Sequence, residues 1–192
     1  MEQTKNGNFI GYINQRKRPG DKNPMFKGRI SQPGTEQQFP LSLWAHEYPD
    51  PKTGEMKTMF NGIAGRFSLS AEAAEQITSL MRHAPDEEAA LGNLTLSARQ
   101  VVLFPNRFKE EAPEKDRPDY WGGFNPGDGS PIVRVSAWMS KDRYQNAILR
   151  GGTSYPIPGK SEAEMQTFDR REQDQLSDQQ SLGSPGGIQM DR

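Results

Sequence analysis

The chain of 192 residues contains no cysteine, which excludes disulfide bonds and thiolate chemistry. Histidine is almost as scarce, with only His46 and His83, and the HExxH, GxSxG and P-loop motifs are absent. His46 and Glu47 are adjacent on a predicted strand, where neighbouring side chains point to opposite faces, so they form a poor catalytic pair. We therefore expect a protein that is not an enzyme and that uses no metal or cofactor.

Long apolar runs are also missing. No stretch approaches the roughly 18 apolar residues of a membrane span, and the N-terminus lacks an apolar segment behind basic residues. The sequence therefore predicts neither a membrane span nor a secretory signal, and a cytoplasmic protein is expected. Only 32% of the residues are hydrophobic, while 15 prolines and 19 glycines are present. This composition favours a mainly β fold with many loops over a helical bundle.

Residues 24–62 resemble residues 118–151, at an offset of about 90 residues. Both segments contain an aromatic strand with glycine, a Pro-Gly turn, a tryptophan strand and a last strand that ends in glycine. The matched positions are Pro24 and Pro118, Phe26 and Tyr120, Gly28 and Gly122, Ile30 and Phe124, Pro33-Gly34 and Pro126-Gly127, Trp44 and Trp138, and Gly62 and Gly151. The shared order predicts an internal duplication of a small antiparallel β unit.

The duplication divides the chain into four segments. Residues 1–69 are predicted to form the first β unit and residues 93–160 the second, each with about four strands in an OB-like or barrel-like arrangement. Residues 70–92 form a helical connector, because Ser70 can cap a helix whose apolar residues recur at helical spacing. Residues 161–192 carry seven acidic residues against three arginines and few apolar ones, so an acidic flexible tail is expected. The pattern leaves open whether the two units share one sheet.

Basic residues concentrate near the other end, where residues 1–30 hold seven Lys/Arg against two acidic residues. In both units, aromatic and basic side chains lie on the strand face opposite the presumed core. Because bases stack on aromatic rings while cations contact phosphates, this pattern is typical of a surface for single-stranded nucleic acid. The candidate stacking residues are Trp44, Tyr48, Trp121 and Trp138, and the candidate phosphate contacts are Lys17, Arg18, Lys27, Arg29 and Arg134.

Two other interpretations remain open. In a sheet that is covered on both sides, Trp44 and Trp138 are core residues, and a helix over residues 71–84 could cover one of them. Alternatively, the aromatic face binds a protein, and the chain acts as an adaptor or inhibitor of a host or phage partner. The acidic tail could recruit such a partner, or compete with nucleic acid for the same groove.

The FxGxI motif at residues 26–30 and LSLWA at residues 41–45, followed by a hairpin to MFNG, carry a resemblance to two families. The chain resembles a short β-domain family of unknown function from bacterial plasmids and integrative elements, and it is similar to OB-fold single-stranded-DNA-binding proteins. The resemblance implies a DNA-processing protein of a phage or mobile element, and it places no residue. Two features depart from the OB family: the tail ends in IQMDR rather than an acidic-hydrophobic tip, and each unit has about four strands rather than five.

Overall fold

The computed structural model describes residues 5–66 and 70–166, without the side chains of residues 74 and 78. Most of the predicted acidic tail, residues 167–192, lies outside the described residues. Near the start of the predicted tail, residues 162–166 form a helical turn against the barrel. No helix within the described part of the chain is long and apolar enough to cross a membrane.

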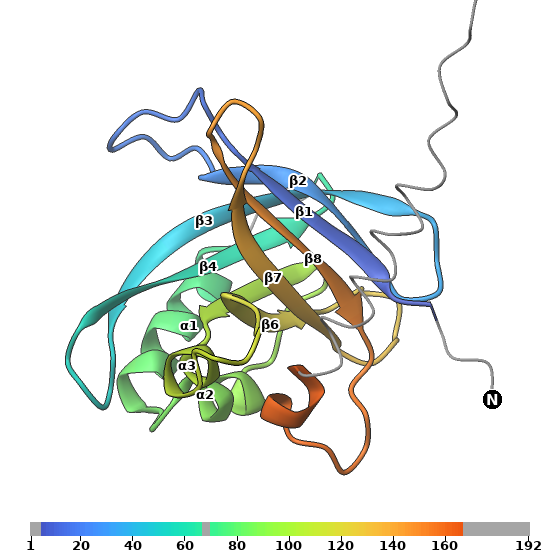
Figure 1. The fold of residues 1–192 in the computed structure, drawn as a ribbon. Helices are drawn as coiled ribbons and strands as arrows, with labels where there is room; N and C mark the ends of the chain where they lie inside the picture. The colour runs from blue at the N-terminus through green and yellow to red at the C-terminus, as the bar shows by residue number, and fades with distance from the viewer. Residues whose placement is uncertain (1–4, 67–69, 167–192) are drawn as a thin grey trace, which may run out of the picture.

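The described residues form a closed barrel of eight antiparallel strands, in which each strand pairs with the next and β8 pairs with β1 (Figure 1). The strands are β1 (Gly7–Ile13), β2 (Phe26–Ser31), β3 (Gln38–Pro49), β4 (Met56–Ala64), β5 (Gln100–Pro105), β6 (Tyr120–Phe124), β7 (Val133–Lys141) and β8 (Ala147–Ser154). The predicted mainly β fold is confirmed. The four strands of each repeat are halves of a single sheet, and this up-and-down order differs from the five-stranded Greek key of an OB fold.

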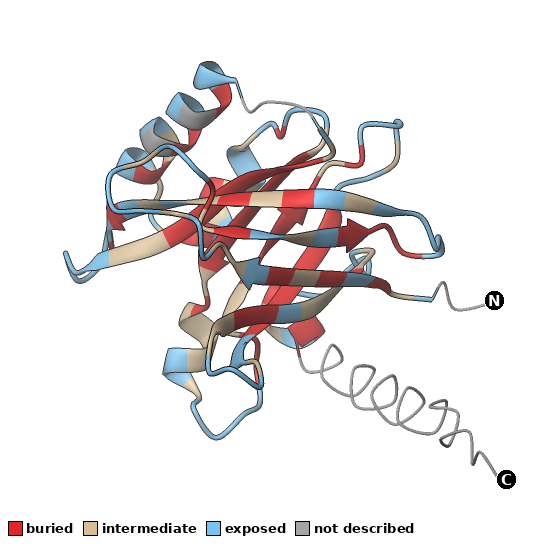
Figure 2. Cartoon of the chain, turned by 90° about the horizontal axis from the view of Figure 1, so that it is seen from above, coloured by how far each residue is buried: buried red, intermediate tan, exposed pale blue. Residues whose placement is uncertain are grey.

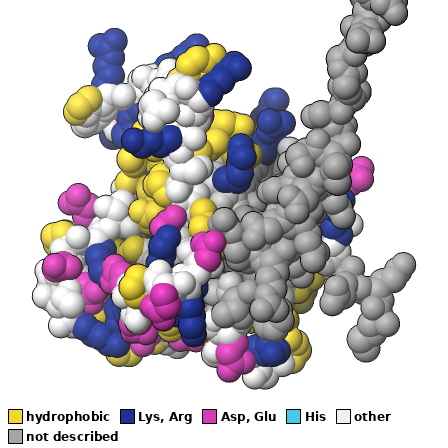
Figure 3. Space-filling model, viewed as in Figure 1, with side chains coloured by type: hydrophobic (Ala, Val, Ile, Leu, Met, Phe, Trp, Pro, Cys, Tyr) yellow, Lys and Arg dark blue, Asp and Glu magenta, His cyan; other side chains and the backbone are white. Residues whose placement is uncertain are grey.

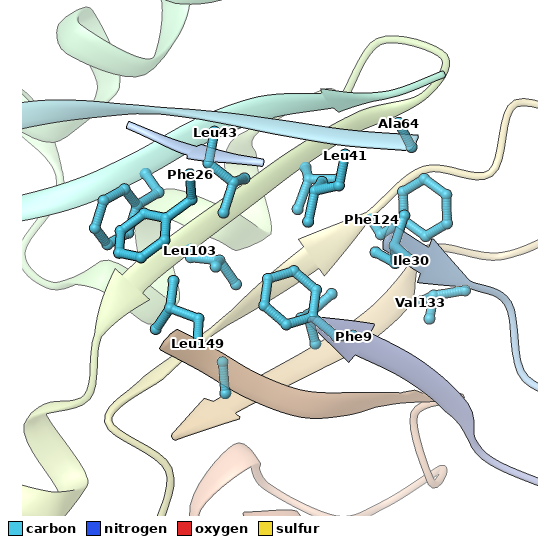
Figure 4. Packing of buried hydrophobic residues seen from close by; sticks show 14 residues of the cluster. Phe9, Phe26, Ile30, Leu41, Leu43, Ala64, Leu103, Phe124, Val133 and Leu149 are labelled. Atoms are coloured by element: carbon cyan, nitrogen blue, oxygen red, sulfur yellow. The ribbon is translucent and has the colours of Figure 1, made fainter. Parts of the chain in front are cut away.

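The barrel interior is filled by one hydrophobic cluster. Alternate residues of every strand point inward, as the two-residue period of a strand requires. Phe26 and Phe60 meet edge to face with ring centroids 5.4 Å apart, and Phe60 makes a second such contact with Tyr120 at 5.1 Å. Figure 4 shows side chains from both halves converging, among them Phe9, Leu41, Leu103 and Leu149. The interior is therefore a packed core with contributions from both repeats.

The two halves share one hydrogen-bonding register, as the predicted duplication requires. The matching pairs are Gly28↔Leu41 with Gly122↔Val135, Leu43↔Gly62 with Ala137↔Gly151, and Phe9↔Gly151 with Val101↔Gly62. Side-chain contacts repeat as well: the amide Nδ2 of Asn14 donates to the carbonyl of Pro24 at 2.9 Å, and that of Asn106 donates to Pro118 at 2.7 Å. Strands β1–β4 and β5–β8 are thus equivalent units.

Four inward-facing glycines occupy equivalent places in the four hairpins: Gly28, Gly62, Gly122 and Gly151. At Gly28, an added Cβ would lie 2.7 Å from the carbonyl carbon of Ile10 and closer still to its oxygen. The same overlap arises between Gly122 and Val102 and between Gly151 and Ser136, also at 2.7 Å from the carbonyl carbon. Glycine at these positions allows the backbones of paired strands to approach closely where the sheet coils into a barrel.

Besides the helical turn at residues 162–166, the described residues form three helices outside the barrel: α1 (Ala71–His83), α2 (Glu87–Asn93) and α3 (Arg107–Glu111). The hydroxyl of Ser70 caps α1 by accepting from the N–H of Ala73 at 3.2 Å, as the sequence predicts. Ile77 and Met81 of α1 and Ala90 of α2 pack with residues of β3, β4 and β5 into a second cluster. Figure 2 shows the buried stripe of α1 turned toward the barrel and its exposed residues turned away. The outer face of the barrel is therefore covered over β3–β5.

Candidate nucleic-acid interface

Four of the nine predicted contact residues are buried: for Tyr48, Trp121 and Arg134 the expected exposure is wrong, and for Trp138 the structure agrees with the alternative interpretation as a core residue. Tyr48, Trp121, Trp138 and Arg134 each expose 9% or less of their surface. All four point out of the barrel, as the alternation pattern predicts. Helices cover Tyr48 and Trp121, and the turn at residues 162–166 covers Arg134.

Tyr48 lies beneath α2. Its hydroxyl donates to Glu87 Oε1 at 2.9 Å, and Arg107 Nη2 donates to Glu87 Oε2 at 2.8 Å. Burial, together with the neighbouring Glu87 carboxylate, raises the pKa of Tyr48 well above its ordinary value. The ring and hydroxyl of Tyr48 thus anchor α2 to the barrel, and they are inaccessible to a base.

Trp121 lies under α3, with its ring 6.0 Å from Phe104 and 6.5 Å from Phe108, measured between centroids. Arg134 lies under the turn at residues 162–166. Its guanidinium donates to both carboxylate oxygens of Glu162, through Nε at 2.9 Å and Nη2 at 2.7 Å. These contacts make Trp121 and Arg134 parts of the packing between the barrel and its covering segments.

The other five predicted residues lie on or beside one open part of the barrel. Lys27 and Arg29 are exposed and point outward from β2, and Arg18 is exposed on the loop before it. Lys17 is half-buried and pairs with Asp21 at 3.0 Å. Trp44 is half-buried, and its indole Nε1–H donates to the carbonyl of Lys22 at 3.0 Å, which holds the ring beside this loop.

The structure adds residues from β1 and β8 that the sequence interpretation missed. Tyr12 is 42% exposed and pairs with Lys27, while Ile10 lies between Arg29 on one side and Arg150 of β8 on the other. We call the outward side chains of these three strands the basic face: Ile10, Tyr12, Lys27, Arg29 and Arg150, with Trp44 at its margin. The two-residue alternation of residues 7–13 was the signal for Tyr12, whereas the proximity of Arg150 depends on barrel closure.

The basic face differs in chemistry from the equivalent surface of the second half. At the positions equivalent to Tyr12 and Lys27 of the first half, the second half has Phe104 and Trp121, both buried under helices. Arg29 is likewise matched by Gly123. The first half therefore has polar, charged residues where its counterpart has an apolar surface that other segments cover.

Charge is concentrated around the basic face. Strands β1, β2 and β8 contain Lys27, Arg29 and Arg150 but no acidic residue. Residues 7–31 and 141–154 together hold nine Lys/Arg and two Asp, an excess of seven positive charges in a chain of net charge −1. In Figure 3, Lys and Arg predominate in the upper part of the view, around the β1–β2 and β7–β8 hairpins, whereas Asp and Glu gather below. Such a local excess attracts polyanions.

Two of the pockets formed by described residues lie away from the basic face. One of about 130 Å³ lies between β3 and α1 and is lined by His46, Tyr48 and Met81, among others; burial lowers the pKa of His46. The other, of about 290 Å³, lies beside Lys109, Asp119 and Tyr120. Within the described residues, no group of three or more His, Asp or Glu side chains is placed to hold a metal ion.

No family model, curated protein or solved structure matches the chain.

Proposed function

We propose that the protein binds single-stranded nucleic acid, DNA in the first instance, on the basic face and with little sequence preference. The observation that carries this proposal is the exposed Tyr12 ring set among Lys27, Arg29 and Arg150, on three adjacent strands without a carboxylate. An exposed ring offers a stacking surface that any base can use, and flanking cations contact phosphates of any sequence.

The geometry of the sheet supports this arrangement. Neighbouring strands lie about 4.8 Å apart, so Arg150 on β8 and Arg29 on β2, separated by β1, are anchored about 10 Å apart with Ile10 between them. Tyr12 lies two residues along β1 from Ile10, on the same face. A nucleic-acid strand that crosses β1 near Tyr12 therefore meets Lys27 and Arg29 on β2 and Arg150 on β8.

Lys17 on the β1–β2 loop pairs with Asp21. Among the described residues, it is the one cation of this loop and of the basic face that forms an ion pair. Lys27, Arg29 and Arg150 are exposed and have no acidic partner there. Contacts between these cations and phosphates release counterions, and this release supplies much of the affinity of such surfaces.

The test is a titration of a fluorescent oligo-dT of about 30 nucleotides, followed by anisotropy over a range of salt concentrations. Each of Lys27→Gln, Arg29→Gln and Arg150→Gln should reduce the slope of log affinity against log salt by about 0.7. Lys115→Gln, an exposed cation on the loop before β6, is the matched control and should leave the slope unchanged.

Tyr12→Ala should weaken binding by about 5- to 150-fold, the range expected for loss of one stacked base, while Tyr12→Phe keeps the ring and should bind nearly as the parent protein does. Absence of binding at about 50 mM salt, where phosphate contacts are strong, would refute the proposal. The alternative, an adaptor or inhibitor that recognises a protein, would not bind oligo-dT and would bind its protein partner through Trp44 with little dependence on salt.

A further inference from the structure

The hairpin between β7 and β8 projects beyond the barrel next to the basic face. The β7–β8 ladder continues to the pair Lys141↔Ala147, whereas pairing of β8 with β1 ends at Ile148↔Tyr12 and pairing of β7 with β6 ends at Ala137↔Tyr120. Residues 139–147 are thus a two-stranded arm without neighbouring strands. Figure 1 shows this arm and the β1–β2 loop leaving the barrel at the same end.

The tip of this arm presents an aromatic ring to solvent. Tyr144 is 69% exposed, and the guanidinium carbon of Arg143 lies 4.8 Å from its ring centroid. The turn is built on Asp142, whose Oδ1 accepts from the N–H groups of Tyr144 at 2.8 Å and Asn146 at 2.9 Å. This turn therefore holds an exposed tyrosine whose ring already contacts an arginine. An aromatic ring beside an arginine is a surface on which an unpaired base can stack.

The position of Tyr144 connects it to Tyr12. Ile148 is the cross-strand partner of Tyr12, and Tyr144 lies four residues before Ile148 along the arm. At about 3.3 Å per extended residue, the two tyrosines are at most about 13 Å apart along the strand direction, because residues 143–145 form the turn. Arg143 at the tip extends the positive charge of the basic face onto the arm.

We propose that Tyr144, with Arg143, is a second stacking platform for the nucleic-acid strand that binds at Tyr12. This inference rests on the proposed function and defines its ligand further: a run of several consecutive unpaired nucleotides long enough to reach from β1 to the tip of the arm. A duplex does not satisfy the site, because its bases hide their faces in the stack.

The test measures the affinity of oligo-dT of increasing length, from about 4 to about 30 nucleotides, for the full chain and for Tyr144→Ala, Tyr144→Phe and Arg143→Gln. The shortest oligomers that bind should bind Tyr144→Ala with an affinity within about twofold of that for the parent protein. Long oligomers should bind Tyr144→Ala about 5- to 150-fold more weakly than they bind the parent. Tyr144→Phe should behave as the parent. Lys52→Gln, an exposed cation on the β3–β4 hairpin, is the control for Arg143→Gln and should have no effect.

Each outcome bears on a different claim. If the parent protein binds and Tyr12→Ala weakens it, but Tyr144→Ala matches the parent at every length, the second platform is refuted and the proposed function stands. If a dT·dA duplex competes as well as the single strand, the inferred ligand class is wrong. If the parent binds no oligomer, the proposed function and this inference fail together.

Discussion

Replacing Gly28 with alanine tests whether close backbone approach at the hairpin glycines is required for barrel closure. An added Cβ would lie 2.7 Å from the carbonyl carbon of Ile10 and 3.0 Å from the Cα of Gly11. The obstructing atoms belong to the backbone of β1, which is paired on both sides with β2 and β8, so a rotamer change cannot relieve the overlap. The strands must separate, which breaks hydrogen bonds of the ladder.

The expected cost follows from this geometry. Overpacking in a core costs typically 1–3 kcal/mol, and displacement of a paired strand places Gly28→Ala at or above the upper end, at about 3 kcal/mol. For a protein of this size, each kcal/mol lowers Tm by about 2–4 °C, so thermal unfolding followed by circular dichroism should show a decrease of about 6–12 °C.

Gly11 provides the matched control, because it is the cross-strand partner of Gly28 and also faces the interior. A Cβ at Gly11 would meet its nearest atom, the Cβ of Phe26, at 3.5 Å, which is ordinary contact. Gly11→Ala should therefore change Tm by far less. Equal destabilisation by the two substitutions would refute the argument from close approach.

Two further predictions concern polar contacts that the sequence did not indicate. Arg134→Ala should destabilise the protein by about 3–5 kcal/mol in urea unfolding, because it leaves Glu162 buried without the guanidinium that contacts both its oxygens. The double variant Arg134→Ala/Glu162→Ala should lose less stability than the sum of the losses of the two single variants. Strict additivity of the two losses would contradict this account. The hydrogen bond from Lys57 lowers the pKa of Asp50 to about 2, below its ordinary value of 3.8. A carboxyl whose pKa is depressed by folding stabilises the fold above its unfolded pKa and loses that contribution as pH falls through the folded value. The difference in stability between the parent protein and Asp50→Asn should therefore be constant above about pH 5 and shrink between about pH 4 and pH 2; a difference that does not change over this window would show that the ion pair is not formed.

The duplication could be predicted from the sequence because it depends on residue types that the local backbone geometry requires. Glycines at Gly28, Gly62, Gly122 and Gly151 recur in the chain since a close approach of strands tolerates no side chain there. The helix at α1 was equally readable, because its cap and its apolar spacing are contained in a few consecutive residues.

The exposure of the aromatic residues could not be predicted from the sequence. Trp44 and Trp138 occupy equivalent positions and have the same alternation pattern, yet Trp44 lies beside a loop and Trp138 is 9% exposed. Alternation states which face of a strand a residue occupies, and it contains no information on what covers that face. Ala45 likewise follows the inward pattern of Leu41 and Leu43 but is exposed, because β3 extends past the end of its pairing with β2.

The sequence by itself determined the mainly β fold, the repeated unit, the connecting helix and the inward set of side chains, since each depends on periodicity and turn residues within one short segment. Only the tertiary structure decided that the two units close into one barrel, that helices cover its outer face over β3–β5, and that Arg150 joins Lys27 and Arg29 around Tyr12. These depend on contacts between residues far apart in the sequence, such as Tyr48 with Glu87, 39 positions apart, and β1 with β8, more than a hundred apart. A pattern along the chain does not record such contacts, because they are fixed by how the barrel closes.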